Sequence, residues 1–427
     1  MSIQSYETKR KEALDAASSL RPGTPIRQLF PIFRNRGGDR PLAFLDTAAS
    51  SQKWGLVVDR LATYYTHEHA NIHRGAYQLS AIATEQYDVA RAKVAEFLKA
   101  KNPKQIIFTR GTTESINLVS YALEGFLDRE DTVLLTLLEH HSNIVPWQLL
   151  KARKGIRLAF VEVNADGSLD LADLKRKLLD LKPKLLATTC LANSLGSVVP
   201  IDEVIALAHS CNCKVLVDAA QAVAHAEIDV QRLVPDFLAF SGHKLYGPTG
   251  IGVLFASEEM LEVMQPFQGG GDMISAVTTD GSTWAEPPQK FEAGTPAIAE
   301  AIALGTAIEM LQAVGLSRVK KHEESLFVSA TEMLKEQSGI TLYGPVTTGG
   351  DQASIVSFNI EGIHPHDFSS IADSYNVQIR AGHHCAMPTL RRLGINASAR
   401  LSFGVYSDSE DLLQLKEAIA HAKKILL

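Results

Sequence analysis

The chain has 427 residues, of which 45% are hydrophobic and 21% are charged, which is the balance of a folded globular protein and not of a disordered one. Its 42 basic and 48 acidic residues are spread along the chain and give a formal charge of −6, so no electrostatic footprint for nucleic acid is present. No apolar run reaches the roughly 18 residues of a membrane span, and the four cysteines are too scattered for a disulfide framework. We therefore expect a cytoplasmic protein, without a membrane partner, that has one large domain and a smaller one.

The N-terminal segment, residues 1–25, is predicted to form a polar helix that ends at the breaker-rich stretch "RPGTP". The acidic residues within "YETKRKEALDA" argue against a plastid transit peptide. We treat the segment as an N-terminal extension and expect no catalytic role for it.

From residue 42 onward, short apolar runs alternate with stretches of helical period such as 85–100. Nearly continuous hydrophobic runs are typical of strands that are buried on both faces of a parallel sheet. Five such runs occupy 105–109, 132–138, 184–192, 213–220 and 236–242.

The polar sequences that follow these five runs indicate a ligand site, because open α/β sheets bind their ligands beyond the carboxyl ends of the strands. In chain order they are "TRGTTES", "EHHSN", "ANSLG", "DAAQ" and "SGHKLYGPTG". The pattern predicts one pocket built from five strand ends.

The first and last of these sequences predict an aldehyde cofactor that carries a phosphate. Thr112 and Thr113 begin a predicted helix, whose free backbone N–H groups and hydroxyls could cradle a phosphate, although threonine is also a common helix cap. Lys244 follows a strand end and could form a Schiff base with an aldehyde, while Ser241 and His243 could add phosphate donors.

The intervening sequences point to a pyridine ring. Asp218 ends a buried strand, where a carboxylate needs a cationic partner such as a protonated ring nitrogen. Gln221 could reach the phenolic oxygen of the ring, and the imidazole of His140 could stack on its face. Together with Lys244 and the phosphate cradle, these residues indicate pyridoxal 5′-phosphate.

Eight ordered motifs between residues 26 and 427 resemble the class II (SufS-type) cysteine desulfurases, which are fold-type I pyridoxal-phosphate enzymes of the class V aminotransferase family. The resemblance implies an α/β architecture, with a large domain that has a mainly parallel sheet (40–305) and a smaller α+β domain (26–39 and 306–427). The motifs are "LDTAASSQ", "HRGAYQLS", "RGTTESINLV", "EHHSNIVPWQ", "DAAQAVAH", "FSGHKLYGPTGIGVL", "FEAGTPA" and "RAGHHCAMP".

The resemblance also implies a role for each matching residue. Lys244 would hold the cofactor covalently, Asp218 would pair with its ring nitrogen, and His140 would stack on the ring. The other implied contacts are the phenolic oxygen for Gln221, the phosphate for Thr112, Thr113, Ser241 and His243, a contribution across a dimer interface for Thr283, and the substrate for Asn193, Arg400, Arg380, His73 and Arg74.

Cys385 would be the nucleophile that takes the sulfur of L-cysteine as a persulfide and leaves L-alanine. Neighbouring Arg380 and a histidine are expected to raise the thiolate fraction of Cys385. The resemblance further implies a homodimer, a SufE- or SufU-like sulfur acceptor, and the supply of iron–sulfur cluster assembly.

Several alternatives stay open from the sequence. Histidines in "HEHANIH" (67–73) and the histidines and thiol of "GHHC" (382–385) have ligand-like spacing, but a metal site would not explain Lys244 or Asp218. A selenocysteine lyase, or an aminotransferase or lyase of another substrate, would use the same cofactor, and a sulfur-relay scaffold with low turnover would use the same thiol. The aminotransferase hypothesis leaves Cys385 without a role.

Overall fold

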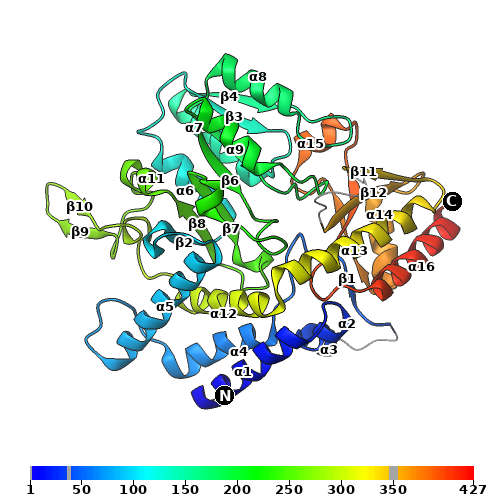
Figure 1. Cartoon of the computed structure of the whole chain (residues 1–427), viewed down its shortest axis with the longest axis horizontal. Helices are drawn as coiled ribbons and strands as arrows, with labels where there is room; N and C mark the ends of the chain where they lie inside the picture. Colours follow the sequence, from blue (N-terminus) through cyan, green and yellow to red (C-terminus); the bar gives the residue numbers. More distant parts are fainter. Residues whose placement is uncertain (1, 36–39, 346–353) are drawn as a thin grey trace.

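The structure is a computed structural model, and it describes residues 2–35, 40–345 and 354–427. Its centre is a seven-stranded sheet with the strand order β2–β8–β7–β6–β5–β3–β4 (Figure 1). Within this sheet β8 is antiparallel to both of its neighbours, and the other neighbouring pairs are parallel. The strands are β2 (Ile106–Thr109), β3 (Thr132–Thr136), β4 (Arg157–Val161), β5 (Leu185–Thr189), β6 (Lys214–Asp218), β7 (Phe237–Ser241) and β8 (Gly252–Ala256).

The prediction of a mainly parallel sheet buried on both faces is confirmed, since each of the five hydrophobic runs contains one strand. Successive side chains of a strand point to opposite faces. In β6, Val215 and Val217 belong to one hydrophobic cluster, whereas Leu216 belongs to another. The edge strand β4 is partly exposed, and for that reason its sequence is less uniformly apolar than that of the buried strands.

Helices surround the large sheet on both faces (Figure 1). Most of them lie between consecutive strands, as the alternating pattern predicts. They are α4 (Gly55–Thr63), α5 (Gln78–Phe97), α6 (Thr112–Ala122), α7 (Val145–Lys154), α8 (Leu171–Leu181), α9 (Ile201–Ser210), α10 (Val230–Leu233), α11 (Glu258–Val263) and α12 (Ile298–Val314).

A second, antiparallel sheet has the strand order β11–β12–β15–β14 and packs against helices to form a separate hydrophobic cluster. Its strands are β11 (Ile340–Tyr343), β12 (Ile355–Ile360), β14 (Arg380–Gly382) and β15 (Ser398–Ser402), and the helices of this part are α13 (Leu316–Lys335), α14 (Pro365–Ser374), α15 (Met387–Arg392) and α16 (Ser409–Leu426). This part is the smaller α+β unit that the resemblance implied.

Two details differ from the expected domain boundaries. β1 (Ala43–Phe44) pairs in parallel with β13 (Val377–Gln378), so a segment assigned to the large domain completes the smaller unit. The predicted boundary after residue 305 falls inside α12, which is a buried apolar helix. Residues 36–39 of the predicted small-domain segment lie outside the described part of the chain.

The N-terminal extension forms α1 (Ile3–Ser19) and packs on α12 and α4, followed by the short helices α2 (Thr24–Arg27) and α3 (Pro31–Asn35). Arg10 binds Glu309 of α12 with two hydrogen bonds, of 3.1 and 2.7 Å. Tyr6 is buried in the main hydrophobic cluster, so the predicted polar helix packs against the core of the large domain. Across the described ranges, no helix by itself has the length and apolarity to cross a membrane; α12 and α13 meet that test only as a pair bent by 73°.

Candidate active site

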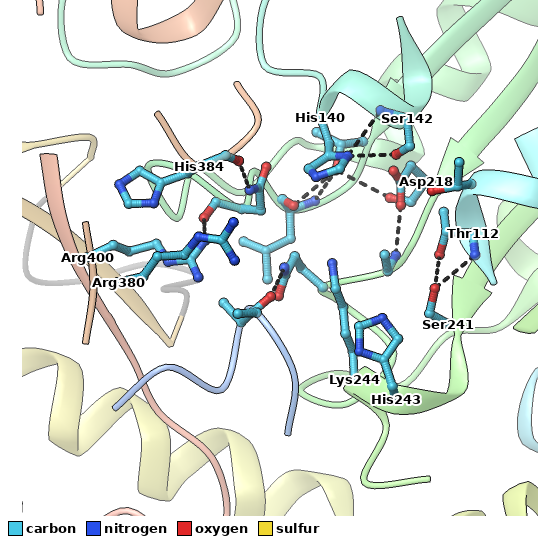
Figure 2. Close-up of a pocket in the computed structure, with 18 residues that line it drawn as sticks. Thr112, His140, Ser142, Asp218, Ser241, His243, Lys244, Arg380, His384 and Arg400 are labelled. Atoms are coloured by element: carbon cyan, nitrogen blue, oxygen red, sulfur yellow. Dashed lines mark hydrogen bonds between the residues drawn. The ribbon is translucent and has the colours of Figure 1, made fainter. Parts of the chain in front are cut away.

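A cavity of about 200 Å³ lies at the carboxyl ends of the parallel strands, as the positional argument predicts. In Figure 2, the two arginines of the cavity lie on one side and Asp218 on the other, with Lys244 and His140 between them. The structure brings together these residues that the sequence analysis singled out: Thr112, Thr113, His140, Asn193, Asp218, Gln221, Ser241, His243, Lys244, Arg380 and Arg400.

One end of the cavity is the start of α6. The backbone N–H of Thr112 donates to Ser241 Oγ at 2.8 Å, and the two hydroxyls lie 2.7 Å apart. Gly252 of β8 lies so close to Gly111 that a Cβ at Gly252 would stand 2.3 Å from Gly111 Cα. The helix start, its threonines and Ser241 are thereby held together as an anion cradle that suits a phosphate.

Asp218 and Lys244 occupy the ends of the adjacent strands β6 and β7. Asp218 is buried and accepts a hydrogen bond from the N–H of Ala220 at 2.9 Å, and burial raises the pKa of its carboxyl. Burial lowers the pKa of Lys244 to about 8, although the charge of Asp218 opposes this shift. The cavity therefore offers a carboxylate that needs a cationic partner and an amine that is readily neutral.

His140 is held as a neutral ring. Its Nδ1 accepts the backbone N–H of Ser142 at 3.1 Å, which leaves the ring proton on Nε2. Burial, reinforced by the charge of Lys244, lowers the pKa of His140 to about 3. His243 is also neutral, because burial lowers its pKa to about 4. Gln221 is oriented by donating from Nε2 to the carbonyl of Ala48 at 2.8 Å.

The opposite end of the cavity carries two guanidinium groups. Arg400 of β15 is 1% exposed and donates to the carbonyl of Asn193 at 2.8 Å and to Asp46 Oδ1 at 2.9 Å. Arg380 lies opposite Arg400 in the β14–β15 register. Arg400 Nε and Asn193 Oδ1 are buried without a partner among the described residues. The unpaired Nε–H donor of Arg400, beside two positive charges, suits a carboxylate ligand.

Cys385 lies on the loop between β14 and α15 and is half-buried. Its neighbour His384 lines the cavity, although Cys385 itself does not. The carbonyl of Cys385 accepts the backbone N–H of His141 at 2.8 Å, and the carbonyl of His384 accepts Asn193 Nδ2 at 2.7 Å. The loop is therefore bonded to the two segments that hold His140 and Asn193.

Three predicted site residues lie away from the cavity within one chain. Thr283 is exposed on the hairpin of β9 (Ile274–Val277) and β10 (Ser282–Trp284), which projects from the body (Figure 1). His73 lines a separate surface hollow, and Arg74 pairs with Asp272 at 3.0 Å. The contact of Thr283 with the cofactor across a dimer interface, and the contacts of His73 and Arg74 with the substrate, stay predictions.

Sequence reasoning missed two acidic residues near the site. Asp46 pairs with Arg400, and Glu139 is fully buried beside the end of β5, where it accepts the N–H of Thr189 at 3.0 Å. Burial raises the pKa of Glu139 to about 8. Both residues stand inside the motifs "LDTAASSQ" and "EHHSN", but a motif does not reveal which of its side chains turn inward.

The histidines and thiols considered as metal ligands form no such group in the structure. Within the ranges described, no three His, Cys, Asp or Glu side chains are arranged to hold a metal ion. Cys213, just before β6, is buried, and burial raises the pKa of its thiol to about 12, as expected of a structural cysteine.

The large mainly parallel sheet, the phosphate cradle, the buried lysine and the buried aspartate define a pyridoxal-phosphate enzyme of fold type I. The anion cradle at the start of α6 and the buried carboxyl of Asp218 fit that cofactor, and the buried amine of Lys244 has the chemistry to bind it covalently. The chain belongs to the class-V aminotransferase family, since the family model described as "Aminotransferase class-V" matches residues 43–415.

Similar proteins include several cysteine desulfurases. The chain is 45% identical over 94% of its length to a "Cysteine desulfurase" of Dickeya dadantii, of which 97% is covered. It is 42% identical over 93% of its length to a "Probable cysteine desulfurase" of Halalkalibacterium halodurans, also covered to 97%. Among solved structures, the apo cysteine desulfurase of Thermococcus onnurineus matches with a TM-score of 0.90 and 38% identity, over 95% of this chain and 100% of that one.

Proposed function

We propose that this protein is a pyridoxal-phosphate-dependent cysteine desulfurase. It converts L-cysteine and the thiol of Cys385 into L-alanine and a persulfide on Cys385. One observation supports this above the others: the cysteine-bearing loop is hydrogen-bonded to the segments that hold His140 and Asn193, at the end of the cavity that has the two arginines.

The protein's own residues divide the work along the cavity. Thr112, Thr113, Ser241 and His243 hold the phosphate of the cofactor, and Asp218 pairs with its ring nitrogen. The bound cofactor supplies an electron-poor ring that stabilises negative charge at the α-carbon of the amino acid.

The substrate is held and deprotonated by groups at the other end of the cavity. Arg400 and Asn193 bind the carboxylate of the substrate. Arg400 has an unpaired Nε–H donor, and Asn193 lies beside Arg400, which donates to its carbonyl. Lys244, whose pKa burial lowers to about 8, can be neutral near physiological pH and moves the proton at the α-carbon.

Sulfur transfer is carried out by Cys385. Its thiolate attacks the sulfur of L-cysteine, so that a sulfur–sulfur bond forms while the bond from Cβ to sulfur breaks. The electron pair left at Cβ takes up a proton, and the product is L-alanine. The net reaction transfers one sulfur atom and consumes no external oxidant.

The test uses the purified protein. We expect a yellow protein that releases alanine from L-cysteine and gains about 32 Da on Cys385 under non-reducing conditions, the mass of one sulfur atom. A yellow protein without alanine or that mass shift would assign the site to another pyridoxal-phosphate reaction. Selenocysteine in a parallel assay separates desulfurase from selenocysteine lyase activity.

The partners and setting are also part of the proposal. We infer a homodimer, because the hairpin that carries Thr283 projects from the body, and Thr283 is exposed and does not line the cavity of its own chain. A SufE- or SufU-like protein is the proposed sulfur acceptor, and alanine release should accelerate when one is added. A cytoplasmic location and a role in iron–sulfur cluster assembly stay predictions from the sequence.

A further inference from the structure

Two histidine rings meet on the loop that presents Cys385, which we call the thiol loop (residues 383–387). His383 Nδ1 accepts the N–H of Cys385 at 3.0 Å, and His141 Nε2 accepts the N–H of Met387 at 3.2 Å. The two rings stack, with centroids 5.6 Å apart and planes 29° apart. One ring comes from the loop itself and the other from the segment that also carries His140.

The carbonyl groups of the thiol loop are bonded to other groups. The carbonyl of His383 accepts the N–H of Ala386 at 2.9 Å, that of His384 accepts Asn193 Nδ2, and that of Cys385 accepts the N–H of His141. Among the described residues, the two imidazoles are the acceptors of the N–H groups of Cys385 and Met387.

A histidine nitrogen accepts a hydrogen bond only when it carries no proton. The bonds therefore require both rings to be neutral, with the proton of His383 on Nε2 and that of His141 on Nδ1. Burial lowers the pKa of His141, which favours its neutral form.

The backbone of the thiol loop is strained. His384 and Cys385 have φ values of 52° and 53°, in the left-handed region that residues with a Cβ rarely adopt. Two such residues in succession persist only where surrounding contacts hold them. The direction of the Cys385 side chain therefore depends on the hydrogen bonds of this loop.

We propose that His141 and His383 are positioning residues for sulfur transfer, which hold the thiol loop by accepting the backbone N–H groups of Met387 and Cys385. The inference rests on the proposed function only because it names sulfur transfer as the affected step. Whether the two histidines hold the thiol loop through these hydrogen bonds can be tested even if the proposed function is wrong.

Matched pairs of variants separate the acceptor from the rest of the ring. His383→Asn keeps an acceptor, since an asparagine oxygen bonds the N–H two residues further on, whereas His383→Ala removes it. His141→Gln places an oxygen near the position of Nε2, whereas His141→Leu removes the acceptor and keeps the bulk. His364→Ala is the control, because His364 Nδ1 accepts the N–H of His366 at 3.3 Å in the same local pattern at the N-cap of α14.

Two measurements on the holoenzyme are made for each variant. Hydrogen–deuterium exchange of the peptide that spans 383–387 reports the two N–H groups directly. Steady-state alanine formation from L-cysteine, with dithiothreitol as sulfur acceptor, reports kcat and KM, and the visible spectrum reports the bound cofactor.

We expect His383→Ala and His141→Leu to exchange faster in this peptide and to lower kcat about fivefold, the effect of one lost neutral hydrogen bond, with KM and spectrum unchanged. His383→Asn and His141→Gln should restore both exchange and kcat, and His364→Ala should match the wild type. Equal exchange in all variants would overturn the proposal, as would a fall in kcat that Asn and Gln do not restore. If the wild type releases no alanine, the proposed function fails, while the exchange comparison still decides whether the histidines hold the loop.

Discussion

The two ends of the cavity are built in different ways. At the cofactor end, Asp218, Ser241 and Lys244 stand at or directly after the ends of β6 and β7, so the central sheet sets their positions. At the thiol end, Cys385 follows β14, a strand of three residues, and is held by bonds from His141 and Asn193. The proposed cofactor residues are therefore placed by the pairing of strands, whereas the proposed nucleophile is placed by contacts between distant segments.

The largest effect is expected at the cofactor end. Lys244→Ala should remove the ~420 nm absorbance of the bound cofactor and lower alanine formation by about 10²- to 10⁴-fold, because both the covalent link and the proton-transferring amine are lost. Absorption spectra and alanine assays measure this. An unchanged band would identify another lysine as the anchor, such as Lys53, whose Nζ donates to the carbonyl of His243 at 2.8 Å.

Replacing Cys385 at the thiol end should separate cofactor binding from sulfur transfer. Cys385→Ala should keep the yellow colour and lose both the persulfide and the turnover of L-cysteine, since no sulfur acceptor remains. The half-buried Cys211 provides the matched control, and Cys211→Ala should behave as the wild type. Turnover that persists in Cys385→Ala would contradict the assignment of the nucleophile.

A conservative change at Arg400 tests the proposed carboxylate site, which lies at the same end of the cavity as the thiol loop. Arg400→Lys should raise KM for L-cysteine about tenfold or more, because a point charge cannot reproduce the planar fork and hydrogen bonds to a charged group contribute about 1.5–3 kcal/mol. Arg391→Lys on the exposed side of α15 is the control. Unaltered KM in Arg400→Lys would place the carboxylate site elsewhere.

The close approach of two backbones at the cofactor end predicts a loss of stability. Gly252→Ala brings a Cβ within 2.3 Å of Gly111 Cα, so the strand and the helix start must move apart, at a cost of about 1–3 kcal/mol in the free energy of unfolding. Thermal unfolding of the holoenzyme measures this cost. At Gly125 a Cβ meets nothing within 4 Å, and Gly125→Ala should leave Tm near that of the wild type.

The smallest expected effect is the pH dependence of cofactor binding. Since the pKa of Lys244 lies at about 8, the neutral amine and the rate of reconstitution of the apoprotein should rise about tenfold between about pH 7 and about pH 9. The charge of Asp218 raises this pKa, so Asp218→Asn should move the midpoint to lower pH. Stopped-flow absorbance measures the rate, and a midpoint that Asp218→Asn does not move would contradict the coupling.

Much of the cofactor end could be predicted from the sequence. Buried parallel strands are apolar throughout their length, and the polar residue that ends such a run is conspicuous. Thr112, Asp218 and Lys244 were singled out by this signal and line the cavity, as do Asn193 and Arg400, for which the family resemblance implied a role in substrate binding. The large mainly parallel sheet followed from the same signal.

The thiol end depended on tertiary contacts. The motif "RAGHHCAMP" predicts that Cys385 is the nucleophile, but it does not show that His383 and His141 stack, that Asn193 bonds the carbonyl of His384, or that Asp46 pairs with Arg400. These contacts join segments separated by up to hundreds of residues, and their existence depends on how the two sheets pack. Successive side chains of a strand point to opposite faces, so a short stretch of sequence is enough to predict which side chains face the core. Which residue a side chain contacts across a packed interface is decided only when distant segments come together in the folded chain.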